Sequence, residues 1–441
     1  MIHYLRITNF GAIRDTAEMN FEVVEVLGDA YEVEMADGVK LMKLAYIYGA
    51  NASGKTTILK AFEFLKDLLL KPAEDKSVLL DFEPFMFRSD PYGHSSFFEL
   101  SFYLAGVRYV YSINFNREFV LSERMVYYRT AKPTEIFSRT TDTEKRLSKV
   151  QFGSTMKVSN KTSDLLEINI LHNNTVLGAY AKTNIDLVDL EVLNIWLSVF
   201  LKGMVIADKD LVLDTAARIA QDSDFAAWMN KLVNKADQQI LGIQVGEEEM
   251  EVKITPKGTS FNHHFSRSFT KSSSLLGSGN WFEFENRRKV DFIHGGDGEE
   301  SYHMPLERES SGTQRYFALG GPLYDLIKSE QLLCIDELET SLHPDLMKYF
   351  LQVFLINAGD SQLLITTHNQ SLMENQDFLR RDALWFCEKG RDGEVNFYSA
   401  ADFDTSVLRK DASLINAYRA GRLGAKPNLG SPLMDSDGER R

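Results

Sequence analysis

The sequence predicts an α/β protein in which two halves of one sheet-containing unit are separated by a long insertion. Three observations lead to this prediction. Apolar strands alternate with helices from residue 289 onward, which is typical of a parallel sheet covered on both faces. Residues 43–70 read as strand, loop and helix. From residue 129 to residue 288 the chain is first polar and then mainly helical, so this stretch interrupts the alternation.

Residues 1–128 are expected to form the first half of this unit, with a mixed sheet and an antiparallel β subdomain. Residues 2–8 alternate as a strand, and a second pair of strands is expected at 21–27 and 31–37. Residues 97–128 predict a three-stranded antiparallel meander, with the dipeptide Ala-Gly as the turn between the first two strands.

Residues 129–288 are the predicted insertion, a polar segment followed by a helical arm over 186–241 and a strand from 242. Residues 289–428 are the predicted second half. The expected strands are 289–294, 331–336, 361–368, 383–389 and 395–402, and the expected helices are 312–327 and 344–354. The tail, residues 429–441, is expected to be disordered.

Composition limits the class of protein. Hydrophobic residues make up 44% and charged residues 25% of 441, which is ordinary for a soluble protein. No apolar run reaches the length of a membrane span, and the first residues lack the pattern of a signal peptide. Cys334 and Cys387 are the only cysteines, so no disulfide framework is implied. We therefore expect a cytoplasmic protein with no membrane partner.

The net charge of −14 argues against a grip on nucleic acid by the whole protein. A local patch stays open, because residues 117–161 contain ten Lys and Arg against five Asp and Glu. Such a run is usually a solvated surface, and its role is left undecided here.

The segment "GANASGKT", Gly49 to Thr56, matches the phosphate-loop pattern G-x-x-x-x-G-K-[ST] between a strand and a helix. The backbone N–H groups of such a loop and of the helix start face phosphates. Lys55 is expected to reach the β- and γ-phosphates of ATP, and Thr56 to bind Mg²⁺. The predicted nucleotide-binding residues here are Gly49, Asn51, Ser53, Gly54, Lys55, Thr56 and Thr57.

Two apolar strands in the second half end in polar residues. "LLCIDELE" delivers Asp336 to the carboxyl edge of the sheet, where Asp336 would bind Mg²⁺ and Glu337 would polarise the attacking water. "LLITTHN" places His368 where it could meet the γ-phosphate. Taken alone, each pattern could equally be a strand that ends in polar residues with no role in binding. The prediction therefore rests on the order in which the two strands follow the phosphate loop.

These motifs, together with "SSGTQ" between them, resemble the ABC-type ATPases, in particular the SMC/RecF/OLD branch. Segments such as "IYGANASGKTTILKA", "ESSGTQRYFALGGPLYDLI", "LLCIDELETSLHP" and "FLRRDALWFCEK" are similar to the OLD-like AAA family ATPases of bacterial anti-phage defence loci, such as the RloA and AbiL ATPases. The similar segments run from near residue 2 to about residue 428, without the polar region 129–165.

The resemblance implies an ATPase that closes as a homodimer or higher homo-oligomer around ATP and Mg²⁺. Ser311, Gly312 and Gln314 would bind the γ-phosphate held by the partner subunit. Taken by itself, the same segment reads as a helix start with Ser310 or Ser311 as the N-cap. "ETSLHP", Glu339 to Pro344, would cross the dimer interface, and His368 would sense the γ-phosphate.

Two departures from the family pattern follow. No glutamine occurs between Thr57 and Val150, so the equivalent of the Q-loop is open, with "DFEPFMFRSD" as the candidate region. Only a short tail follows the last similar segment, so we expect no Toprim nuclease domain. The resemblance then implies a separate effector protein, a nuclease or a toxin. This chain would act as the sensor or regulator of that effector.

Alternative functions are kept. A RecF-like DNA-repair or DNA-binding ATPase would need a basic surface, which the net charge disfavours. A non-catalytic interaction module is disfavoured by the intact Lys55, Asp336, Glu337 and His368. A transporter subunit would carry a usual "LSGGQ" and the missing glutamine, whereas Thr313 stands where glycine is common.

Overall fold

A computed structural model describes residues 1–24, 31–207, 209–255, 274–276, 280–296, 300–374, 380–404 and 413–427. The chain forms two compact units. The first consists of residues 1–204, 330–337 and 360–441, and the second of residues 205–329 and 338–359. Among the described residues, no helix has the length and apolarity to cross a membrane. The predicted tail 429–441 and part of the predicted strand 21–27 lie outside the described residues.

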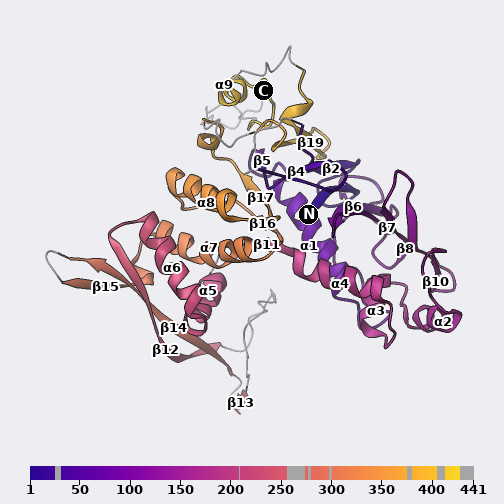
Figure 1. Cartoon of the computed structure of the whole chain (residues 1–441), viewed down its shortest axis with the longest axis horizontal. Coiled ribbons are helices and arrows are strands. Elements are labelled where there is room, and N and C mark those ends of the chain that lie inside the picture. The colour runs from indigo at the N-terminus through magenta and orange to yellow at the C-terminus, as the bar shows by residue number, and fades with distance from the viewer. Residues whose placement is uncertain are drawn as a thin grey trace, which may run out of the picture. The chain divides into compact units, whose positions relative to one another are not determined.

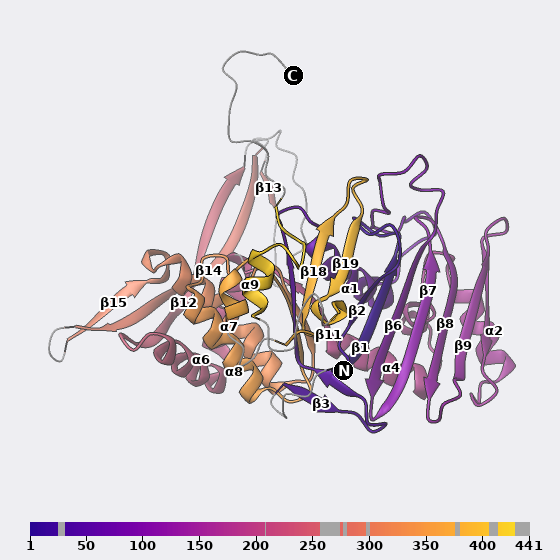
Figure 2. The same ribbon diagram turned by 90° about the horizontal axis from the view of Figure 1, so that it is seen from above.

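An antiparallel sheet of seven strands occupies the first unit, in the order β10-β9-β8-β7-β6-β1-β2. Figures 1 and 2 show β6, β7 and β8 side by side in the purple part of the chain. The predicted meander is confirmed, because each of these strands pairs with the next and Ala105-Gly106 forms the first turn. The strands are β1 (Ile2–Thr8), β2 (Ala17–Asn20), β6 (Ser96–Leu104), β7 (Val107–Phe115), β8 (Val120–Tyr128), β9 (Thr134–Asp142) and β10 (Leu147–Phe152).

The sheet continues beyond residue 128, which sequence patterning did not indicate. β9 and β10 pair with each other and β9 pairs with β8. The polar sequence of β10 fits an edge strand, because its positions alternate between exposed and buried. Even one of the buried positions, Ser148, is polar. The predicted division of the chain at residues 128 and 288 follows motif order and stays a prediction.

The second large sheet has six strands in the order β11-β16-β17-β5-β18-β19 and is mixed. β5, β16, β17 and β18 run parallel, and β19 is antiparallel to β18. The predicted α/β class with a mixed sheet is therefore confirmed. These strands are β5 (Leu44–Gly49), β11 (Leu201–Val205), β16 (Leu332–Ile335), β17 (Gln362–Thr367), β18 (Leu384–Lys389) and β19 (Val395–Ser399). A short pair, β3 (Glu32–Glu34) and β4 (Lys40–Met42), lies outside both sheets.

One buried glutamine joins the two large sheets. The side chain of Gln362, at the start of β17, accepts a hydrogen bond from the N–H of Ile2 at 2.6 Å and donates to the Ile2 carbonyl at 2.9 Å. It also donates to the Met42 carbonyl at 3.3 Å. A buried amide with its donors and acceptors paired in this way holds the first strand against the strand that leads to His368.

Helix α1 (Lys55–Leu70) packs on β5 and β17 and buries one apolar face. Three further helices of this unit are α2 (Asn160–Asn169), α3 (Val176–Lys182) and α4 (Val188–Phe200). α1 contacts both α3 and α4. A short terminal helix, α9 (Leu414–Arg419), and the 3-10 turns η2 (Gln370–Glu374) and η3 (Ala400–Asp402) complete the described part of the unit.

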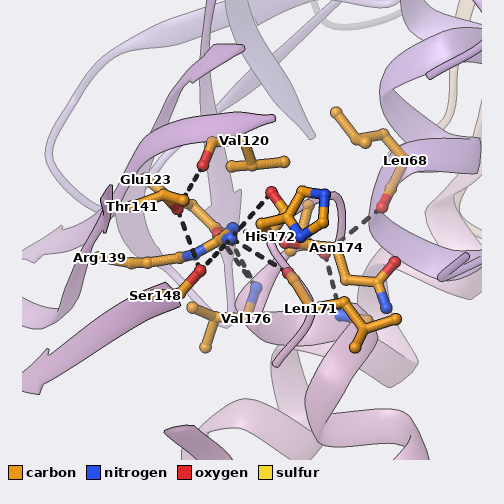
Figure 3. A network of polar contacts seen from close by, with 12 residues as sticks. Leu68, Val120, Glu123, Arg139, Thr141, Ser148, Leu171, His172, Asn174 and Val176 are labelled. Carbon is orange, nitrogen blue, oxygen red and sulfur yellow. Dashed lines mark hydrogen bonds and ion pairs between the residues drawn. The ribbon is translucent and has the colours of Figure 1, made fainter. Parts of the chain in front are cut away.

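A buried ion pair between Glu123 of β8 and Arg139 of β9 anchors residues 171–176 to the antiparallel sheet (Figure 3). The Arg139 guanidinium donates to Ser148 and to three backbone carbonyls, and Glu123 accepts from the N–H of Val176 at 2.9 Å. The three carbonyls belong to Leu171, His172 and Asn174. The same segment holds α1, because the Thr175 hydroxyl donates to the Leu68 carbonyl at 3.3 Å.

The second unit is a group of helices on a strand hairpin. α5, α6 and α7 pack on one another, and α5 and α6 also contact the long antiparallel pair of β12 and β14. The helices are α5 (Lys209–Gln221), α6 (Ser223–Ala236), α7 (Ser311–Lys328) and α8 (Pro344–Asn357), with the turn η1 (Leu306–Arg308). The strands are β12 (Ile240–Thr255), β13 (Ser274–Leu276), β14 (Asn280–Gly295) and β15 (Ser301–Pro305). The predicted helical segment 186–241 contains α4, α5 and α6, although β11 interrupts it, and α2 and α3 are further helices before it.

Candidate functional site

The phosphate-loop residues lie between β5 and α1, as predicted. β5 is buried along its length, so the loop begins from a rigid position. Gly54 is the N-cap of α1 and has φ +97°, a left-handed conformation that strains any residue with a Cβ. A Cβ there would also lie 2.5 Å from Cγ2 of Val395. Glycine is therefore required at Gly54 for both backbone conformation and space.

Lys55 is buried and folds back over this loop. Its Nζ donates to the carbonyls of Gly49 at 2.9 Å and Ala50 at 3.1 Å. Cys387 pairs with Gly49 in the sheet, and burial raises the pKa of its thiol to about 12 while Lys55 opposes that rise. Cys387 is thus a neutral thiol, and the positive charge at the loop is that of Lys55.

The loop also contains a buried polar atom that fits a phosphate. The Ser53 side chain is 3% exposed, and its hydroxyl has no hydrogen-bond partner among the described residues. Buried hydroxyls are nearly always paired, so this hydroxyl is able to hydrogen-bond a phosphate oxygen placed in the loop. Asn51 is exposed in the loop, and Thr57 lies in the first turn of α1 against Gly11.

Thr56 and Asp336 meet, although 280 positions separate them in the chain. The Thr56 hydroxyl donates to Oδ2 of Asp336 at 3.0 Å. A hydroxyl beside a carboxylate suits Mg²⁺, which takes few protein ligands and keeps waters and phosphates in its shell. Among the described residues there is no group of three or more His, Cys, Asp or Glu that could hold a metal without such help.

Thr366, which the sequence analysis did not assign, organises the acidic end of the site. Its hydroxyl donates to Oδ1 of Asp336 at 2.5 Å and accepts from the N–H of Glu337 at 2.8 Å. Glu337 has φ +48° and is exposed, whereas Asp336 is half-buried. The left-handed turn separates the environments of the two neighbouring carboxylates. The pair of threonines before His368 was the available signal for this contact.

His368 follows the last residue of β17 and is exposed. Its chain segment is held by the hydroxyl of Tyr48, which donates to the Asn369 carbonyl at 3.0 Å. The N–H of Asn369 donates to the Thr367 hydroxyl at 3.0 Å. Because β17 lies between β5 and β16 and all three are parallel, the phosphate loop, His368 and Asp336 follow the carboxyl ends of adjacent strands.

The predicted signature residues belong to the second unit and form their own local structure. Ser310 is the N-cap of α7, since its hydroxyl accepts from the N–H of Thr313 at 3.1 Å; Ser311 is the first helical residue. Gln314 donates to the Glu309 carbonyl at 2.9 Å. A Cβ on Gly312 would lie 2.9 Å from the Ser341 carbonyl, so Gly312 permits close approach of the segment Glu339–Pro344.

The candidate Q-loop region lies beside the start of α1 through Gly11. The N–H of Gly11 donates to the Glu83 carbonyl at 2.7 Å, and a Cβ on Gly11 would lie 2.9 Å from Cγ2 of Thr57. The N–H of Phe85 donates to the Asn9 side chain at 3.2 Å. This candidate region is thus held by hydrogen bonds to the strand-end turn at residues 9–11.

Comparisons with known proteins complete the description. The sequence model of a family described as "AAA domain, putative AbiEii toxin, Type IV TA system" matches residues 44–374. No curated protein matches the chain. Similar solved structures include an SmcHead bound to the C-winged helix domain of ScpA, with 11% identity, a TM-score of 0.40, and coverage of 90% of this chain and 97% of that chain. Another is the SMC head domain from Thermotoga maritima, with 14% identity, a TM-score of 0.38, and coverage of 90% and 98%.

Proposed function

The chain belongs to the family of AAA domains described as putative AbiEii toxins of type IV toxin–antitoxin systems, and on that premise we propose that it is a Mg²⁺-dependent ATPase. One observation carries the proposal. Three adjacent parallel strands end in the phosphate loop, in His368 and in Asp336, and the Thr56 hydroxyl is 3.0 Å from the Asp336 carboxylate. Open α/β sheets bind their ligands at this edge.

Each residue has a role that its surroundings support. Lys55 and the N–H groups at the start of α1 hold the phosphates, and the Ser53 hydroxyl adds a hydrogen bond. Thr56 and Asp336 hold Mg²⁺, which when bound offsets the negative charge of the phosphates. Glu337, exposed and turned out of the strand, orients the attacking water and accepts its proton. His368 donates a hydrogen bond toward the terminal phosphate.

Replacing Lys55 with alanine is expected to weaken ATP binding by roughly tenfold or more, because a charge-assisted contact to phosphate is lost. Isothermal titration with ATP and Mg²⁺ measures the affinity. Lys60→Ala is the matched control, since Lys60 is exposed on the same helix. Equal affinities for Lys55→Ala and the unchanged protein would show that this loop does not bind the nucleotide.

We further propose that two copies close around ATP, with the signature helix of each completing the site of the other. The support is the helix N-terminus at Ser310–Gln314, whose N–H groups and small residues suit a phosphate, and the resemblance to ABC-type ATPases. Ser311 is exposed and able to face a partner.

Ser311→Arg is expected to abolish ATP-driven association while single chains keep their affinity for ATP. An arginine at this position would place a long side chain where the partner's phosphate must approach. Light scattering with and without ATP, in chains that also carry Glu337→Gln to slow hydrolysis, measures the effect. Ser301→Arg, at an exposed position of β15, is the control. Association that survives Ser311→Arg would remove the signature from a role in trans.

The biological role we propose is a sensor or regulator that uses ATP closure to control a separate nuclease or toxin in anti-phage defence. The resemblance to OLD-like defence ATPases supports it. In cells that carry the gene with its neighbours, Lys55→Ala should lose protection against phage while Lys60→Ala keeps it. Equal plaque counts for both variants would contradict the defence role.

A DNA-binding role finds less support in the charges. Several basic side chains of residues 117–161 are already paired within the first unit: Arg139 with Glu123, Arg124 with Glu135, and Arg146 with Glu118. These pairs reduce the positive charge available to a phosphate backbone.

A further inference from the structure

Helix α4 exposes a continuous apolar stripe on its outer side. Val188, Val192, Ile195 and Val199 are 67%, 47%, 55% and 45% exposed. Residues three and four positions apart lie on one face of a helix, so these four side chains form a single seam rather than scattered contacts. A seam of this length on a soluble protein marks an interaction surface.

The opposite face of α4 is firmly attached to the first unit. Leu190, Leu193, Leu197 and Phe200 are at most 1% exposed. The ring of Trp196 stacks on Phe102 of β6 with centroids 4.6 Å apart. The exposed seam therefore stands on a fixed helix, which lowers the entropy that a partner would lose on docking.

The spacing of the seam residues along α4 is the same from either end of the helix. Its spacings are four, three and four residues, which is the a/d pattern of a two-helix contact. In an antiparallel pair with a twofold axis between Val192 and Ile195, Val188 would lie opposite the partner's Val199. Val192 would then lie opposite the partner's Ile195. Each layer pairs β-branched side chains of similar size, so the surface is complementary to itself.

The charges select the antiparallel arrangement. Asp186, Asp189 and Glu191 are exposed at the start of α4, and Lys202 is exposed just beyond its end. α4 itself contains no Lys or Arg. A parallel pair would bring six carboxylates together, whereas an antiparallel pair sets each acidic end against the partner's Lys202. The backbone at Lys202 is fixed, because Lys66 donates to its carbonyl at 2.7 Å.

Other cations near the seam do not alter the preference for an antiparallel pair. Lys182 of α3 donates to the carbonyls of Pro72 and Ala73, both at 3.1 Å. Arg129 lies over the ring of Tyr127 on the antiparallel sheet. Lys202 therefore remains the cation placed at the end of the seam.

We propose that α4 is the interface of a nucleotide-independent homodimer, formed by antiparallel, twofold-symmetric contact with a second copy of this chain. This contact uses no residue of the nucleotide site, so it goes beyond the ATP-driven closure proposed above. A chain with both contacts can link ATP-closed pairs into larger assemblies, because each copy offers two separate self-complementary surfaces.

The test measures mass by sedimentation velocity without nucleotide, in chains carrying Ser311→Arg so that ATP-driven association is excluded. These chains are expected to show the mass of two copies. Ile195→Asp is expected to raise the dissociation constant roughly a hundredfold, since each dimer buries the substituted position twice. Ile168→Asp is the matched control, an isoleucine that is 78% exposed on helix α2, and it should keep the mass of two copies.

A charge exchange identifies the direction of the pairing. Lys202→Glu alone and Asp189→Lys alone should each weaken self-association, because like charges then meet at the ends of the seam. A chain that carries both changes should regain the mass of two copies, because an antiparallel pair then sets opposite charges against each other at both ends, whereas a parallel pair would set like charges together.

Three results would overturn the proposal: single chains at all concentrations without nucleotide, unchanged mass with Ile195→Asp, or no recovery in the chain that carries both charge changes. The first would also follow if another protein covers the seam. None of these results bears on ATP binding or on ATP-driven closure, so failure of the α4 contact is distinguishable from failure of the proposed ATPase.

Discussion

Replacing Glu337 with glutamine should slow ATP hydrolysis by a factor of about 10²–10⁴, the usual contribution of a positioned general base. Glutamine keeps the size of the side chain but cannot accept a proton from water. The backbone contact between the Glu337 N–H and Thr366 does not involve the side chain, so the local turn should persist. ATP binding should therefore remain, and the closed pair of chains should accumulate.

Phosphate release at saturating ATP and Mg²⁺ measures this rate, and light scattering follows the closed pair. Glu330→Gln is the matched control. Glu330 is exposed and precedes the same strand, β16, at its opposite end from Glu337. Equal rates for Glu337→Gln and Glu330→Gln would assign proton transfer to another group and leave Glu337 without a catalytic role.

Replacing Arg139 with methionine should lower the free energy of unfolding by about 3–5 kcal/mol, the usual loss when one partner of a buried ion pair is removed. The side chains of Arg139 and Glu123 are both fully buried, with Nη1 3.4 Å from Oε2. Without the guanidinium, the Glu123 carboxylate and the Leu171, His172 and Asn174 carbonyls would lose a donor in a dry environment (Figure 3).

The loss should also depend on pH. Burial raises the pKa of Glu123, and Arg139 is the main group that opposes this rise. A raised carboxyl pKa means that stability is fully present below the unfolded-state pKa and is lost as pH rises through the folded-state pKa. Because Arg139→Met lets that pKa rise further, its deficit relative to the unchanged protein should grow as the pH rises above the unfolded-state pKa of the carboxyl group.

Urea unfolding followed by circular dichroism measures both effects. Arg146→Met is the control, because Arg146 and its partner Glu118 are both about half exposed and such pairs contribute little. The double change Arg139→Met with Glu123→Leu should recover part of the loss, since no charge is then left buried. A pH-independent deficit in Arg139→Met would mean that Glu123 is not the group left unpaired.

Local patterns were sufficient for the elements whose chemistry is contained in a short stretch. Three strand-like segments in 97–128, with the Ala-Gly turn between the first two, predicted β6, β7 and β8 closely. The phosphate loop was recognisable because its glycines and its lysine stand at fixed spacings within one short segment, Gly49 to Thr56. Asp336 and His368 were recognisable because a buried strand must end before a polar residue can reach the edge of the sheet.

Patterns were insufficient where partners are far apart in the chain. Arg139 looked like one cation of a basic surface run, yet it is 1% exposed because Glu123 and the carbonyls of Leu171, His172 and Asn174 surround it. Thr366 looked like an ordinary strand residue, and its contacts with Asp336 and Glu337 exist only because β16 and β17 are neighbours. The seam on α4 was not apparent for the same reason, because only packing decides which apolar residues of this helix are buried and which stay exposed.

The amino-acid sequence by itself determined the fold class, the phosphate loop and the order of the motifs, because these depend on side-chain periodicity and on local backbone chemistry. The tertiary structure decided which hydroxyl meets Asp336, which arginine is buried and which face of α4 stays exposed. Those outcomes depend on strand order and on packing between distant segments, where burial turns an ordinary threonine, arginine or valine into a contact with a defined partner.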